Sequence, residues 1–199
     1  MYPVPFSGNA VYTAIFWTTY ALWLALEFIA SRTKRHREDP SRARDRGSLW
    51  LLVILFWVGN SLAFALSFLL QQATILGHRT AIFFLGIALM LAGMAFRRYA
   101  MSVLGRFFTF EVAIHSGHSL VEAGPYRYIR HPSYTGVFIT QIGLGLALGN
   151  WASLAALLVC LGIGYVYRIS VEEAALIAAL GEPYQRYMRR TARLIPFVF

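Results

Sequence analysis

The sequence predicts an all-α, polytopic integral membrane protein with about five transmembrane helices. Of its 199 residues, 58% are hydrophobic and 14% are charged, whereas soluble domains average about 25% charged residues. The mean hydropathy is +0.55. The apolar residues are gathered in long runs, and a helix needs about 20 of them to cross about 30 Å of hydrocarbon. The sequence lacks the two-residue alternation of a transmembrane β-barrel.

The apolar runs give the candidate spans in chain order: residues 9–30, 49–71, 79–96, 134–149 and 151–167. The first run has neither a cationic leader nor a small-residue cleavage site, so we do not expect a removable signal peptide. The last two runs are short and meet at Gly149 and Asn150, which predicts a tight helical hairpin.

The chain beyond the last apolar run is predicted to stay helical. The helix should reach Leu180 and stop at Gly181, a residue type common at helix ends. A new helix should start at Pro183, because proline suits the first turn, and should run to about Arg190.

The cations are distributed unevenly along the chain. Seven lie in residues 32–46, five in 97–130 and five in 168–193, which leaves only Arg79. With five helices threaded alternately, these three segments share one side, so the positive-inside rule predicts an outside N-terminus and a cytoplasmic C-terminus. The net charge of +9 therefore indicates the lipid bilayer as partner, not nucleic acid. The basic loop 32–48 either sets this topology or also binds anionic head groups.

A group of cations and a histidine precedes the fourth run. Arg127, Arg130 and His131 stand just before Pro132, which suits the first helical turn and leaves free N–H groups pointing to the cytoplasmic side. A carboxylate is the natural ligand for such a group. The alternative for the two arginines alone is that they flank the membrane. One helix face beyond them holds Tyr134, Phe138 and Gln141.

Two adjacent acids follow the fifth run. Glu172 lies four residues after Arg168 and is able to pair with it. Glu173 is then left to hold a cation or a hydroxyl-bearing ligand, unless both acids simply face water. The last predicted helix places further polar side chains at i, i+3 and i+6: Tyr184, Tyr187 and Arg190.

Other chemistries find little support. His115 and His118 have a metal-like spacing without further ligands to complete a tetrahedral site, so no metal is predicted. Cys160 lies within an apolar run and is expected to be a packing residue. Gly145 and Gly149 are spaced for close helix packing, and no Rossmann domain is expected around them.

The combination of motifs resembles the isoprenylcysteine carboxyl methyltransferase family over roughly residues 93–196. The matching motifs are Arg130-His131-Pro132-x-Tyr134-x-Gly136, then Glu172-Glu173, then Gly181-Glu182-x-Tyr184-x-x-Tyr187, preceded by His118-x-Leu120-Val121-x-x-Gly124-Pro125-Tyr126. The chain departs from the family at Thr191-Ala192, where Val-Pro is common, and at Tyr99, where Trp is common. These departures concern the acceptor contacts more than the cofactor site.

The resemblance implies an enzyme that binds S-adenosyl-L-methionine and releases S-adenosyl-L-homocysteine. It implies that Arg190 faces the reacting carboxylate, with Glu173 and Tyr134 also catalytic. The cofactor-binding residues that it implies are His118, Tyr126, Arg130, His131, Pro132, Tyr134, Gly136, Glu172, Glu173 and Tyr184. Five spans, without the additional N-terminal helices of eukaryotic relatives, lead us to expect a prokaryotic member in a plasma membrane.

The resulting organisation has two parts. Residues 1–96 are predicted to hold three transmembrane helices with the basic loop 32–48. Residues 97–199 are the predicted catalytic region, with a cytoplasmic connection, the hairpin 134–167 and C-terminal amphipathic helices. A lipophilic acceptor is expected to enter between helices. Two alternatives remain: a methyltransferase for a phospholipid amine or hydrophobic thiol, and a non-catalytic transporter or assembly subunit.

Overall fold

A computed structural model of the protein describes residues 4–33, 47–105 and 120–195. Within these residues the regular structure is helical, with two isolated β-bridges and no strand, which confirms the predicted fold class. The elements are α1 (Ala10–Thr33), α3 (Ser48–Leu69), η1 (Gln71–Ala73), α4 (Arg79–Leu104), η3 (Gly124–Arg127), α5 (Pro132–Leu148), α6 (Trp151–Leu180) and α7 (Glu182–Arg190).

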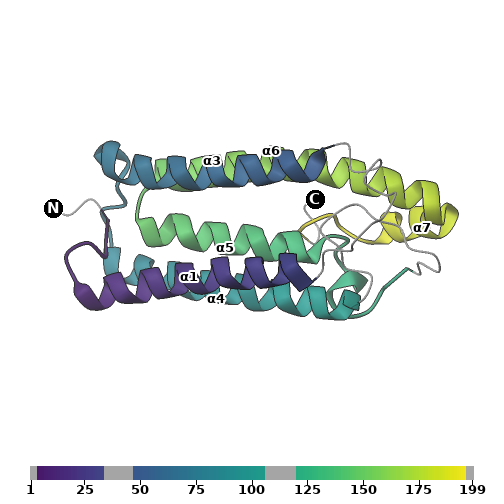
Figure 1. Cartoon of the computed structure of the whole chain (residues 1–199), viewed down its shortest axis with the longest axis horizontal. Coiled ribbons are helices and arrows are strands. Elements are labelled where there is room, and N and C mark those ends of the chain that lie inside the picture. The colour runs from purple at the N-terminus through teal and green to yellow at the C-terminus, as the bar shows by residue number, and fades with distance from the viewer. Residues whose placement is uncertain (1–3, 34–46, 106–119, 196–199) are drawn as a thin grey trace.

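The five long helices run alternately up and down, side by side (Figure 1). Four of those described, α1, α3, α4 and α6, are long and apolar enough to cross a membrane. The remaining predicted span, the fourth in chain order, is α5, which has 17 residues, near the lower limit for a spanning helix. It lies between the α3–α6 pair and the α1–α4 pair (Figure 1). The protein is therefore an integral membrane protein of the predicted kind.

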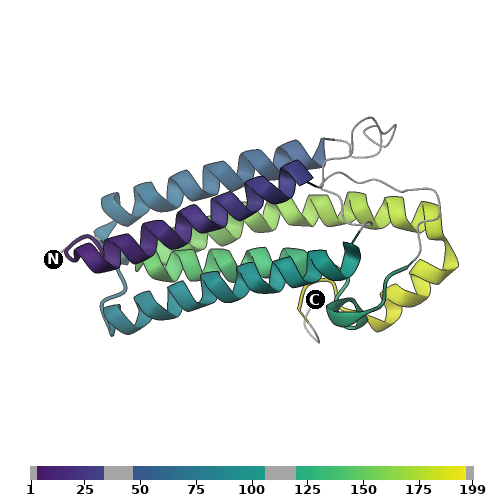
Figure 2. The same cartoon turned by 60° about the horizontal axis from the view of Figure 1, so that its bottom comes forward.

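Two helices are longer than their apolar runs. The third continues past residue 96 to Leu104, so the predicted division between 96 and 97 falls inside α4. The last, α6, continues past residue 167 without a break to Leu180. Its 30 residues make a helix of roughly 45 Å, longer than the hydrocarbon core is thick. Its last turns and α7 extend past the end of the bundle (Figure 2).

Both predicted helix stops are confirmed. Gly149 ends α5 in the left-handed region, with φ 67°, and Gly181 follows α6 with φ 60°. Asn150 then caps α6, because its side-chain oxygen accepts a hydrogen bond from Ser153 N at 3.1 Å. Its amide nitrogen donates to the Leu70 carbonyl at 2.9 Å, so the hairpin tip is also tied to the end of α3.

Close contacts between helices occur at small residues. A Cβ on Gly145 would lie 2.7 Å from Leu154 on α6, which confirms its predicted packing role. Across α3 and α6, a Cβ on Gly59 would lie 2.9 Å from the Cβ of Cys160, so the cysteine is indeed a packing residue. Small residues are common where membrane helices approach closely.

The tightest approach is between α4 and α5, and it gives a stability prediction. A Cβ on Gly143 would lie 2.5 Å from the Gly86 carbonyl oxygen and 2.6 Å from Met90 N. Backbone atoms cannot move aside cheaply, so we expect Gly143→Ala to destabilise the fold by about 1–3 kcal/mol or more. Gly162 on α6 is the matched control, since a Cβ added there would have nothing within 4 Å. Thermal unfolding in detergent measures both variants, and equal melting temperatures would contradict the packing argument.

Candidate active site

One end of the bundle is closed by the pairing of two segments that are distant in the sequence. After α7 the chain turns back beside the residues that precede α5, with a parallel β-bridge between Ile129 and Ala192. Arg130 N donates to the Ala192 carbonyl at 2.8 Å, and His131 N donates to the Arg193 carbonyl at 3.0 Å. These backbone bonds fix the register that brings the side chains of Arg130, His131 and Arg193 to α6.

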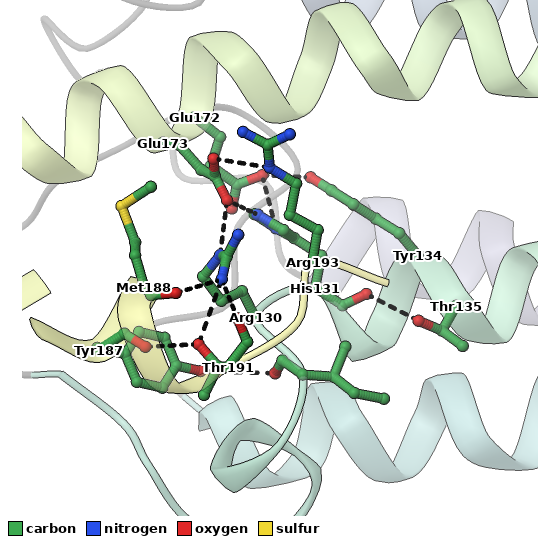
Figure 3. Close-up of polar contacts among 11 residues, drawn as sticks. Arg130, His131, Tyr134, Thr135, Glu172, Glu173, Tyr187, Met188, Thr191 and Arg193 are labelled. Carbon is green, nitrogen blue, oxygen red and sulfur yellow. Dashed lines mark hydrogen bonds and ion pairs between the residues drawn. The ribbon is translucent and has the colours of Figure 1, made fainter. Parts of the chain in front are cut away.

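Glu173 is the centre of the resulting cluster (Figure 3). Its Oε1 accepts from Arg130 Nε at 2.8 Å and lies 3.3 Å from His131 Nε2, while its Oε2 accepts from Arg193 Nε at 3.3 Å. The Glu173 side chain is only 6% exposed. A buried carboxylate is costly unless it is paired and hydrogen-bonded, so these three partners are what allow the acid to lie there.

His131 lies between both acids. Its Nδ1 is 3.7 Å from Glu172 Oε2, on the opposite side of the ring from Glu173. The Tyr134 hydroxyl donates to the same Glu172 oxygen at 2.6 Å. The rings of His131 and Tyr134 are stacked at 5.3 Å with an interplanar angle of 3°. The ring of Tyr165, on α6, lies 4.4 Å from that of Tyr134. An aromatic wall therefore stands beside the paired acids.

Arg130 also joins the cluster to α7. Its Nη1 donates to the Met188 carbonyl at 3.0 Å and to the Thr191 carbonyl (Figure 3). The Tyr187 hydroxyl, also on α7, donates to the Tyr126 carbonyl at 2.6 Å. Arg130 is thus surrounded by acceptors from two elements, with only 8% of its side chain exposed. It holds α7 and α6 together.

The tyrosines around α7 keep their protons. Burial raises the pKa of Tyr126, Tyr184 and Tyr187 well above the usual value for a phenol. For Tyr184 the nearby carboxylates of Glu172 and Glu173 raise the pKa further. The Tyr187 hydroxyl is therefore a hydrogen-bond donor at neutral pH, as its bond to the Tyr126 carbonyl requires.

A second ion pair supports this end of the bundle from the membrane side. Arg97 on α4 donates to both carboxylate oxygens of Glu27 on α1, at 2.6 and 2.8 Å. Its Nη1 also donates to the Ser133 carbonyl, at 3.2 Å, in the first turn of α5. An acid near the end of a membrane helix can pair with a cation or extend to the head groups, and for Glu27 the structure shows the pair.

The structure brings most of the predicted site residues together. The cluster contains Arg130, His131, Tyr134, Glu172 and Glu173. Pro132 begins α5, Tyr126 is buried in η3 and Tyr184 is buried on α7. The predicted partner of Glu172, Arg168, donates to Ser48 Oγ on α3 at 2.8 Å.

Two of the predicted residues that the structure describes lie outside the cluster. Gly136 faces α4, where an added Cβ would lie 2.7 Å from that of Arg97, so helix packing accounts for this glycine. Arg190 forms an ion pair with Glu122, away from Glu173, and its side chain is 58% exposed. His118 lies outside the described residues. Their predicted roles remain predictions.

Arg193 is the member of the cluster to which the sequence assigned no individual role. From its sequence, the tail after α7 has the character of a basic segment at the membrane interface. The bonds that direct it to α5 are made by backbone atoms. One side-chain signal exists, because Thr135 Oγ1 donates to the Leu194 carbonyl at 2.7 Å. A threonine hydroxyl one turn into α5 is too common to have predicted this contact.

These features define a class of protein: a polytopic membrane protein with a buried cluster of acids, arginines and a histidine at one end of its helices. Residues 85–178 match the model of a family described as the isoprenylcysteine carboxyl methyltransferase (ICMT) family. This segment, somewhat less than half of the chain, is therefore similar to that family, in agreement with the resemblance of its motifs.

Several curated proteins are similar to this chain in sequence. The chain is 36% identical over 108 residues to a protein-S-isoprenylcysteine O-methyltransferase of Schizosaccharomyces pombe, covering 53% of this chain and 46% of the relative. It is 37% identical over 116 residues to the Saccharomyces cerevisiae protein of the same name, covering 57% and 48%. A probable enzyme of this kind from Oryza sativa is 32% identical over 117 residues, covering 58% and 61%. The chain spans about half the length of the curated relatives it matches.

A solved structure is also similar. It is titled as the eukaryotic intramembrane Ras methyltransferase ICMT without a monobody, and it aligns with a TM-score of 0.57 at 26% sequence identity. The alignment covers 73% of this chain and 52% of that one. The similarity extends over more of the chain than the family match does, and it supports the predicted membrane helical fold.

Proposed function

We propose that the protein is an integral membrane methyltransferase that uses S-adenosyl-L-methionine to methylate the carboxylate of an isoprenylcysteine-like or other lipophilic acceptor. The observation that carries the proposal is the cluster in which His131 lies between Glu172 and Glu173, with arginines around it. It lies on the part of the chain that matches the family, at one end of the membrane helices.

The described residues fit the chemistry of the methyl donor. Glu172 is 28% exposed and offers a carboxylate to an ammonium group or to ribose hydroxyls. The stacked rings of His131 and Tyr134 offer π-faces, and such a face stabilises a cation by about 0.5–2 kcal/mol. When bound, the donor supplies an electrophilic methyl group on a sulfonium. Glu172, His131 and Tyr134 would hold that donor.

A carboxylate acceptor also suits the cluster better than an amine or a thiol. A carboxylate is already ionised at neutral pH, whereas the other two must lose a proton to a base. The Glu173 oxygens already accept hydrogen bonds from Arg130, His131 and Arg193, so this acid is poorly placed to serve as that base. Alignment is then the main task of the site, and high effective molarities account for at most about 7–11 kcal/mol of a barrier.

The proposal also states on which side of the membrane the site lies and how the donor and the acceptor reach it. Most of the described cations lie at the cluster end of the helices, which supports a cytoplasmic site under the positive-inside rule. The water-soluble donor then enters from the cytoplasm. The acceptor enters sideways from the bilayer, because its tail is as apolar as the lipid.

Two assays on the purified, detergent-solubilised protein test this function. Calorimetric titration with S-adenosyl-L-homocysteine is expected to give saturable binding. Transfer of a radiolabelled methyl group is then compared between an S-farnesylcysteine carboxylate, phosphatidylethanolamine and an alkyl thiol, and the carboxylate is expected to receive the label.

Each outcome separates the alternatives. Absence of binding heat at saturating concentration removes both enzymatic functions and favours a transporter or assembly subunit. Label found in the amine or the thiol, with none in the carboxylate, keeps the methyltransferase and replaces its acceptor.

A further inference from the structure

Arg193 is fixed in place by the backbone around it. The residues on both sides of it are held, since Ala192 pairs with Ile129 and the Leu194 carbonyl accepts from Thr135 Oγ1 at 2.7 Å. The Arg193 carbonyl itself accepts from His131 N at 3.0 Å. The side chain therefore starts from a fixed point next to the cluster, and its Nε reaches Glu173 Oε2 at 3.3 Å.

The three side chains that contact Glu173 differ in solvent exposure. The side chains of Arg130 and His131 are 8% and 4% exposed, respectively. The Arg193 side chain is 41% exposed although it contacts the same buried acid. Solvent therefore reaches part of the Arg193 side chain, whereas Arg130 is enclosed by the Met188 and Thr191 carbonyls.

Arg190 is the competing candidate, and its surroundings differ. It lies at the end of α7 with its Nη2 on the carboxylate of Glu122, and both side chains are largely exposed, at 58% and 39%. Glu122 belongs to the segment before η3, not to the cluster. In this arrangement Arg190 braces α7 against that segment, while Arg193 lies beside His131 and the acids.

We propose that Arg193, rather than Arg190, is the arginine that binds the acceptor's carboxylate. A guanidinium binds a carboxylate through a planar fork of N–H groups, which fixes orientation as well as charge. The ion pair with Glu173 holds that fork at the edge of the cluster. This inference rests on the proposed function, and it assigns the acceptor contact within it.

The chemistry of the step is balanced with no further reactant. One carboxylate oxygen forms a bond to the methyl carbon while the carbon–sulfur bond of the donor breaks, and that bonding pair stays on sulfur. No proton is transferred. The negative charge on the acceptor is lost as the ester forms, so Arg193 binds the acceptor more strongly than the product, which favours release.

A binding comparison tests the assignment without turnover. With S-adenosyl-L-homocysteine bound, the affinity for an S-farnesylcysteine carboxylate is measured against that for its carboxamide. We expect Arg193→Gln to weaken carboxylate binding by about 10- to 100-fold, the worth of a hydrogen bond between charged groups. Carboxamide binding should change much less. The affinity for S-adenosyl-L-homocysteine should fall less than that for the carboxylate, because Glu173 keeps its contacts with Arg130 and His131.

Arg193→Lys keeps the charge but loses the fork, so an intermediate loss is expected, in a variant that retains an ion pair with Glu173. Arg186→Gln is the matched surface control, because Arg186 is 60% exposed and pairs with Glu182 one turn away on α7. Thermal unfolding checks that Arg193→Lys and Arg186→Gln are folded. The Arg186→Gln variant should keep the preference for carboxylate over carboxamide.

The opposing results are distinct. If Arg190→Gln abolishes the preference for carboxylate and Arg193→Gln keeps it, the assignment is overturned in favour of Arg190. If Arg193→Gln weakens the binding of S-adenosyl-L-homocysteine as much as the binding of the carboxylate, Arg193 contacts the donor and not the acceptor. If the unmodified protein binds carboxylate and carboxamide equally, the proposed acceptor itself is wrong, and the Arg193 assignment fails with it.

Discussion

Glu173→Gln is expected to abolish measurable S-adenosyl-L-homocysteine binding and to destabilise the folded protein. The carboxylate is 6% exposed and holds Arg130, His131 and Arg193 in one cluster. Its removal leaves Arg130 buried without a counter-charge, and breaking a buried ion pair costs about 3–5 kcal/mol. The half-exposed Arg193 adds little, because solvent screens it. Thermal unfolding and calorimetric titration, both in detergent, measure the two effects.

Two further variants separate charge from folding. Glu173→Asp keeps the charge at a shorter reach and should recover part of the stability. Glu182→Gln removes an acid that is 72% exposed and pairs with Arg186 one turn along α7, so it should cost only about 0.3–0.5 kcal/mol. A folded Glu173→Gln protein that binds S-adenosyl-L-homocysteine with unchanged affinity would remove Glu173 from the proposed site.

The sequence predicts most of this fold because its signals are local. Apolar runs, the turn at Gly149 and Asn150, and the stop at Gly181 each depend on residues within a few positions. The meeting of the motif at 130–134 with the acids at 172 and 173 was also predicted, because alternate threading returns both segments to one end of the bundle.

Other features depend on helix rotation and on backbone pairing, which local patterns do not encode. Tyr134 and Gly136 are two residues apart, which is about 200° around a helix, so they cannot lie on the same face of α5. The structure accordingly turns Tyr134 to Glu172 and Gly136 to Arg97. Helical geometry alone predicts this divergence. It does not predict that the tail carries Arg193 to the cluster, since main-chain bonds to residues 128–131 set the register of the tail.

Glu27→Gln is expected to destabilise the protein by about 3–5 kcal/mol, because it leaves the buried charge of Arg97 without its partner. The Arg97 side chain is 7% exposed, and both bonds to Glu27 are 2.8 Å or shorter. Arg97→Met should cost less, because the Glu27 side chain is 28% exposed and water can solvate the remaining charge. Thermal unfolding of the single variants in detergent gives both values.

The double variant Glu27→Leu with Arg97→Met tests what the pair contributes beyond stability. Replacing a buried ion pair by apolar residues is often neutral, so the melting temperature should recover most of the loss of Glu27→Gln. The bond from Arg97 to the Ser133 carbonyl is still missing in this variant, and that carbonyl lies in the turn between His131 and Tyr134. We therefore expect weaker S-adenosyl-L-homocysteine binding at near-normal stability. Normal affinity in the double variant would show that α1 and α4 support the fold alone and do not position the cluster.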